Sequence, residues 1–158
     1  MQDQLIETWQ IHNRINLYVL NAIDKGALEG VASNGGRSVK LIFAHMHNVR
    51  LMWLKEIAPD AAAAVENIAA KTNADKAAIT KKRLESALTA SAQAIEDVLR
   101  RSFETGKIRG FKPHPAAFLG YLIAHESYHR GEIGIILTQA GTPLDQKVAY
   151  GMWEWGSR

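Results

Sequence analysis

The stretch AAFLGYLIAHESYHRGEIGIILTQAG, residues 116–141, combines a long apolar run with two histidines four positions apart. Pro115 suits the first position of a helix, where the missing backbone donor does no harm, and Gly141 suits the C-terminal cap. The stretch therefore predicts one long helix. His125 and His129 share a face of it, because residues i and i+4 lie about 40° apart around a helix axis.

Three earlier segments also carry apolar residues at helical spacing, and a shorter one follows the last. These segments are residues 3–24, 38–58, 75–104 and 142–158. Asp75 is expected to cap the third of them, and Pro59 to stop the second. No strand pattern or internal repeat is present. The sequence predicts a single all-α domain, residues 1–158, folded as a four-helix bundle with a short extra C-terminal helix.

Composition narrows the classes of function. The 158 residues include no cysteine, which excludes disulfides, cysteine-based zinc sites and a cysteine nucleophile. The net charge is +3, and the basic residues are scattered rather than gathered in a stripe, so no nucleic-acid partner is expected. Neither a signal-peptide pattern nor a membrane-length apolar run is found, so we expect a cytoplasmic protein with no membrane association.

The histidine pair on the last long helix allows two interpretations. Their face is otherwise apolar or aromatic, so the imidazoles are expected to point inward. They could be core histidines that satisfy their own hydrogen bonds. Alternatively, the H-x-x-x-H spacing lets two ring nitrogens reach one metal ion. Glu132 shares the face of His125 and His129 in angular projection, which favours the second interpretation.

The second long helix offers a further inward histidine. His45 shares a face with apolar residues, among them Val49 and Met52, whereas His47 lies near Arg50 and is expected to face solvent or a boundary. Three imidazole nitrogens from two helices would leave at least one metal position open. Such a position is typical of catalytic or ligand-binding metal sites.

One histidine of the first helix also faces inward. His12 lies on the same face as Trp9 and Asn16, where it could line a pocket, serve as an acid or base, or simply satisfy hydrogen bonds at a boundary. His114, between Pro113 and Pro115, reads as a loop residue without a role.

Two motifs resemble the DinB/YfiT-like family of metal-binding four-helix bundles. They are FAHMHNVRLMWL at 43–54 and HESYHRGEIGIILTQAG at 125–141, the latter similar to the family's H-x-x-x-H-R-G-Q-I signature. The resemblance implies that His45, His125 and His129 bind a divalent transition metal, zinc or nickel. It also implies a homodimer. Glu132 stands where the family often has Gln, and could be a fourth ligand, an acceptor for an imidazole N–H, or a base.

The resemblance further implies a metal-dependent small-molecule transferase that uses a low-molecular-weight thiol as co-substrate, or a thiol-dependent isomerase. Glu132 or His12 would then move a proton. The residues expected to line the substrate pocket are Trp9, Asn16, Val49, Tyr121 and Tyr128. The alternatives are a non-catalytic metal- or ligand-binding stress or sensor module, and a helical dimer whose histidines satisfy one another.

Overall fold

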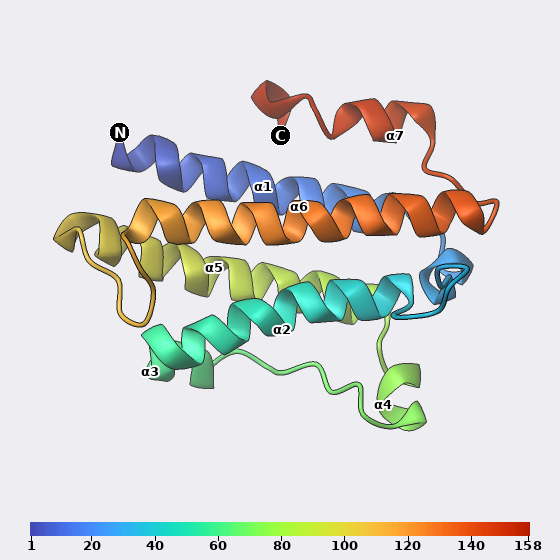
Figure 1. Cartoon of the computed structure of the whole chain (residues 1–158), viewed down its shortest axis with the longest axis horizontal. Helices are drawn as coiled ribbons and strands as arrows, with labels where there is room; N and C mark the ends of the chain where they lie inside the picture. Colours follow the sequence, from blue (N-terminus) through green and yellow to red (C-terminus); the bar gives the residue numbers. More distant parts are fainter.

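Four long helices lie side by side in the computed structural model, which describes residues 1–158 (Figure 1). They are α1 (Gln2–Ala22), α2 (Val39–Ile57), α5 (Lys81–Thr105) and α6 (Pro115–Gln139). No strand is present, and the one isolated β-bridge joins Val31 to Ser38. The prediction of an all-α four-helix bundle is confirmed.

Short elements fill the connections and the C-terminal end. They are η1 (Gly26–Glu29), α3 (Pro59–Ala63), α4 (Asn73–Ala77), α7 (Gln146–Gly151) and η2 (Trp155–Ser157). The predicted short C-terminal helix corresponds to α7, which lies along the bundle beside α1 in Figure 1.

The ends of the helices follow local capping chemistry, with one departure from the prediction. Pro115 is the first residue of α6, and Gly141 follows this helix with a φ of 74°. Asp75 does not cap a long helix, because a separate turn, α4, intervenes. There Asp75 completes a capping box with Thr72, and α5 begins later, capped by Thr80. Two local helix caps therefore separate α4 from α5, whereas helical periodicity alone predicted one continuous helix.

The long helices are arranged so that α5 packs mainly against α1 and α2, while α6 contacts each of the other three. Apolar side chains fill the interior in two clusters, of 16 and 12 buried residues. The first includes Val19, Phe43 and Leu84, and the second includes Trp9 and Leu54.

A buried polar layer lies between the two apolar clusters. On α6, for example, Leu122 belongs to one cluster and Ile133 to the other, with Glu126 and His129 buried between them. Each of the other long helices likewise carries buried polar side chains between its contributions to the two clusters. The layer consists of His12, Asn13, Asn16, His47, Arg50, Ser91, Glu126 and His129.

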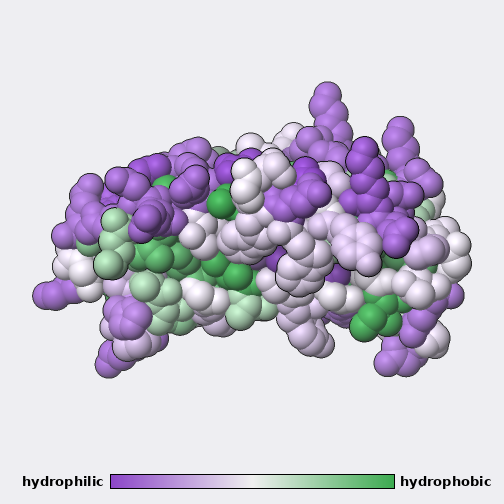
Figure 2. All heavy atoms as spheres, turned by 90° about the horizontal axis from the view of Figure 1, so that it is seen from above, coloured by the Kyte–Doolittle hydropathy of each residue, from purple (hydrophilic) through white to green (hydrophobic).

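The surface is mostly polar, with local apolar groups. Figure 2 looks down on the molecule from the C-terminal side and shows hydrophobic residues as a band near one end and a smaller group near the other. The C-terminal segment itself exposes large aromatic side chains, including Trp153 and Tyr150. None of the helices has the length and apolar character needed to cross a membrane.

Candidate metal centre

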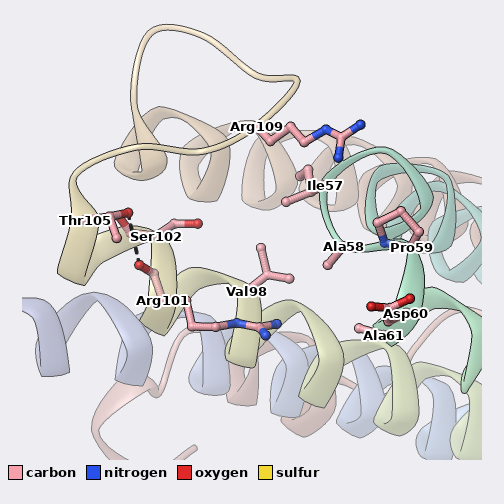
Figure 3. Close-up of a pocket in the computed structure, with 10 residues that line it drawn as sticks. All are labelled: Ile57, Ala58, Pro59, Asp60, Ala61, Val98, Arg101, Ser102, Thr105 and Arg109. Carbon is pink, nitrogen blue, oxygen red and sulfur yellow. Dashed lines mark hydrogen bonds between the residues drawn. The ribbon is translucent and has the colours of Figure 1, made fainter.

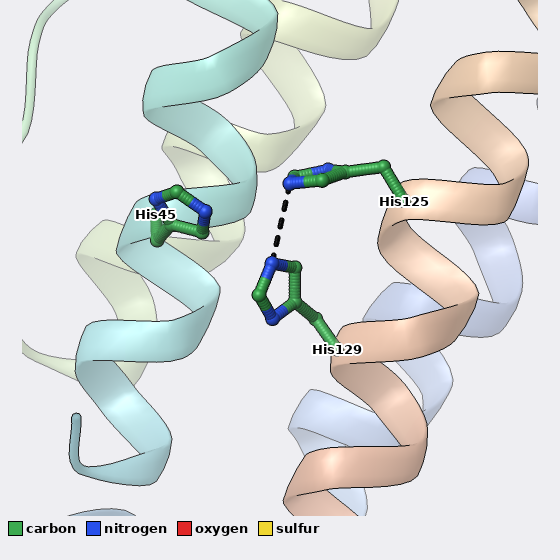
Figure 4. Close-up of side chains that lie close together, drawn as sticks. All are labelled: His45, His125 and His129. Atoms are coloured by element: carbon green, nitrogen blue, oxygen red, sulfur yellow. Dashed lines mark hydrogen bonds between the residues drawn. The ribbon is translucent and has the colours of Figure 1, made fainter. Parts of the chain in front are cut away.

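His45 of α2 meets His125 and His129 of α6 at the edge of the polar layer (Figure 4). One nitrogen from each ring lies within 4.8 Å of the other two. The Nε2 atoms of His125 and His129 are 3.2 Å apart, and the ring centroid of His45 lies 4.8 Å from that of His129. The structure thus brings together the three histidines that the sequence singled out as ligands.

The facing Nε2 atoms of His125 and His129 have the spacing of two ligands of one metal ion. Nitrogens bound to one tetrahedral zinc ion at about 2.0–2.1 Å lie about 3.3 Å apart, close to the separation of the two Nε2 atoms. A ligand imidazole must be neutral. Burial lowers the pKa of His45 to about 4, aided by the positive charge of Arg37, and burial also lowers the pKa of His125. The rings of His45 and His125 therefore offer lone pairs near neutral pH.

Glu132 lies beside the triad and contacts His129. Its Oε2 is 2.9 Å from Nδ1 of His129. Donation of a proton from Nδ1 to this carboxylate leaves Nε2 of the same ring with its lone pair directed at His125, which is how ligating histidines are commonly oriented. The Nδ1 of His125 is buried without any hydrogen-bond partner. Of the roles left open for Glu132, this position matches an acceptor for an imidazole N–H.

The residues predicted to line a substrate pocket are divided between two places. Tyr121 stacks on His125 with ring centroids 6.1 Å apart, and Tyr128 meets His129 edge-on at 5.2 Å while remaining largely exposed. Val49 lies one turn after His45 on α2 and is half-buried.

Trp9 and Asn16, by contrast, are fully buried inside the bundle, away from any triad contact. Trp9 donates its indole N–H to the carbonyl of Ala92, and Asn16 bonds to Glu126.

None of the five main surface hollows includes a residue of the triad. The hollow drawn in Figure 3, of about 440 Å³, lies where the end of α2 and α3 approach the end of α5. Asp60 is its one carboxylate, and Arg101 and Arg109 project at its rim. Its other polar groups include the hydroxyls of Ser102 and Thr105, and its residues form no cluster of three metal ligands.

His12 belongs to a buried charge network rather than to the triad. Its Nε2 is 2.8 Å from Oε2 of Glu126, a fully buried carboxylate on α6. Arg50 binds the same carboxylate through two hydrogen bonds, of 2.6 and 2.7 Å. Burial acts to raise the pKa of Glu126, but the charge and hydrogen bonds of Arg50, together with His12, hold it well below its usual range. The predicted role of His12 in proton transfer at the triad gains no contact in support.

His47 is fully buried, so the expectation that it faces solvent or a boundary was wrong. Its Nδ1 lies 3.1 Å from Ser91 Oγ, and its Nε2 lies 2.7 Å from the carbonyl oxygen of Glu66. The segment between α3 and α4 covers this face of α2. His114, expected to be an idle loop residue, caps α6 by accepting a hydrogen bond from the backbone of Ala117.

Sequence reasoning also missed Arg50 and Glu126 as partners. A usable signal was present, because Glu126 sits at helical spacing within the apolar series Leu119, Leu122 and Ile133. A charge in such a stripe requires a buried partner.

Comparison with known proteins identifies the family. The sequence profile of the DinB family matches residues 1–153. No curated protein and no solved structure gives a match. The match covers nearly the whole chain, both motifs included, and agrees with the helical bundle, so the chain belongs to the DinB family.

Proposed function

We propose that this protein is a metal-dependent transferase that acts on a small electrophile with a low-molecular-weight thiol as co-substrate. His45, His125 and His129 would hold the divalent transition metal, with zinc or nickel as the expected ion. The convergence of three imidazoles from two helices, with Glu132 bonded to one of them, carries this proposal.

The arrangement of the chain's own groups supports an open site. Because Glu132 is engaged with Nδ1 of His129, three ring nitrogens remain as ligands, one fewer than a closed tetrahedral site requires. A divalent ion bound there would supply the positive charge that stabilises a thiolate. The chain has no cysteine, so it offers no thiol of its own to compete for that position.

The aromatic residues around the triad would orient the bound molecules. Tyr121 stacks on His125, and the rings of Trp53 and Phe111 continue the aromatic surface on one side. Tyr128, which is 70% exposed, stands over His129 on the solvent side. These rings offer apolar contact to a substrate and limit the access of water to one flank of the site.

Metal content and thiol consumption together test the proposal. Protein purified without added metal is expected to carry about one divalent ion per chain by elemental analysis, and His125→Ala to carry almost none. His114→Asn is the matched control, because it removes an imidazole elsewhere while keeping a capping side chain. Metal-loaded wild type should deplete thiol from mixtures of low-molecular-weight thiols and electrophiles, and His125→Ala should not.

A non-catalytic metal-binding or sensor module is the second candidate. It is favoured by the lack of a triad residue in any of the five main hollows. Stoichiometric metal with no thiol depletion against the whole panel would select this candidate. Equal, negligible metal in wild type and His125→Ala would overturn both. The homodimer implied by the family resemblance stays a prediction, which sedimentation equilibrium checks.

A further inference from the structure

A separate cavity lies on the side of α6 that faces α1 and the C-terminal segment. Its volume is about 380 Å³, and its walls include Ile15, Met152, Trp153 and Trp155, with Arg130 as the only charged lining residue. No triad residue contributes to it, although Arg130 follows His129 in the chain.

Two glycines of α6 create the room for this cavity. Gly131 and Gly134 both line it, and a Cβ atom added at either would meet no heavy atom within 4 Å. Glycine destabilises the interior of a helix, and neither position has a positive φ that would call for it. The space above this part of the helix is therefore open enough for a ligand.

Arg130 enters the cavity with unused donors. Its Nη1 donates to Asn16 Oδ1 at 2.6 Å and lies 3.3 Å from His12 Nδ1, while Nη2 donates to Ser127 Oγ at 2.8 Å. A guanidinium carries five N–H groups, so Nε and one hydrogen of Nη2 have no acceptor in the protein. All three of its partners are uncharged groups, since burial lowers the pKa of His12.

The buried charges nearby do not balance. Buried Arg50 and half-buried Arg130 contribute two positive charges, and Glu126 contributes one negative charge. Arg50 occupies both oxygens of that carboxylate, and His12 and Asn16 share one of them, so Arg130 forms no ion pair. A partly buried cation without a counter-ion is unfavourable, and an anion in the adjoining cavity would relieve it.

We propose that this cavity binds a small monocarboxylic acid with an apolar or aromatic body, its carboxylate accepting hydrogen bonds from Arg130. A planar guanidinium matches a carboxylate with two parallel bonds. The cavity's volume falls within the range of about 300–1,000 Å³ typical of small-molecule sites. The tryptophans would cover the body of the acid. A phosphate group, with more charge to neutralise, would find only one cation here.

Calorimetric titration of the full chain tests this site, with acetate, hexanoate, phenylacetate and indole-3-acetate as probes. At least one of the three larger acids should bind and quench tryptophan fluorescence. Phenylacetamide and inorganic phosphate should bind at least tenfold more weakly. Arg130→Gln should weaken the best acid at least tenfold, whereas Arg109→Gln, at the hollow of Figure 3, should not.

A second variant tests the cavity independently, in case Arg130→Gln does not fold. Gly134→Leu places a side chain in open space and favours the helix, so it should fold while blocking the acid. His125→Ala should bind the acid as wild type does, which separates this site from the metal centre. The proposal is overturned if no acid binds wild type, if either blocking variant binds normally, or if amide or phosphate binds equally well.

Discussion

Two polar clusters at the same level of the bundle differ in how fully their atoms are bonded. In the network around Glu126, both carboxylate oxygens are bonded, and Arg50 also donates to Asn13 and to the carbonyl of Leu88. In the histidine triad, two Nε2 atoms face one another, and Nδ1 of His125 is buried without a partner. The carboxylate of Glu126 thus has no free oxygen for a further partner, whereas the unsaturated triad is suited to a ligand.

Breaking the hydrogen-bond network around Glu126 should destabilise the fold more than a substitution beside the triad. Glu126→Gln keeps the shape of the side chain but leaves Arg50 buried without a counter-ion, and is expected to lower the free energy of unfolding by about 3–5 kcal/mol. Equilibrium urea denaturation of metal-free protein measures this loss. Glu132→Gln is the matched control, expected within about 0.5 kcal/mol of wild type because its side chain is more exposed. Similar losses in both variants would contradict the distinction between the clusters.

A substitution beside the triad should instead change the affinity of the triad for a metal ion. This prediction rests on the proposed metal centre. Glu132→Gln weakens the acceptor on Nδ1 of His129, and such changes typically reduce affinity about 10–100-fold. Competition with a chromophoric chelator measures this effect, with Glu104→Gln on α5 as the control expected to match wild type. Complete loss of binding would instead identify Glu132 as a ligand. Unchanged affinity would remove it from the site.

The smallest expected effect is a pH dependence within the network. Burial lowers the pKa of His12, so its folded form stays neutral and contributes stability above the unfolded pKa of about 6.5. That contribution is lost as pH falls from there through the lowered folded pKa, with a slope of at most about 1.4 kcal/mol per pH unit.

Urea denaturation between pH 7.5 and 5 measures the free energy of unfolding of wild type and of His12→Gln. The excess stability of wild type over this variant should decrease as pH falls. Ser91→Ala perturbs the same layer without removing a titrating group, so its curve should run parallel to that of wild type. A difference in the free energy of unfolding between wild type and His12→Gln that stays constant with pH would contradict the lowered pKa of buried His12.

The long helices and the triad were within reach of the sequence, because both follow from local spacing. His125 and His129 share a face through the period of the helix alone. The apolar series on α2 correctly indicated His45, although His45 is only half-buried and Met52 of that series is exposed. The ends of α6 followed from Pro115 and Gly141.

What escaped prediction depends on contacts between distant segments. Glu126 and Arg50 are 76 residues apart, and the apolar stripe around Glu126 indicates that it needs a partner without identifying Arg50 as that partner. His47 is buried only because the segment carrying Glu66 folds back over α2. Asn16 and Trp9 were correctly placed on an inner face, but that face meets the charge network and Ala92 instead of the triad. Periodicity identifies an inner face without identifying what it packs against.

The polar layer also fixes the register of the helices. Apolar contacts are less directional than hydrogen bonds, so the apolar clusters alone specify the register less sharply. A slip of α6 by one turn, about 5.4 Å, would carry Glu126 out of reach of Arg50 and into an apolar cluster. Arg50 stands on the same helix as His45, and Glu126 on the same helix as His125 and His129. The ion pair therefore sets the height at which the three imidazoles meet.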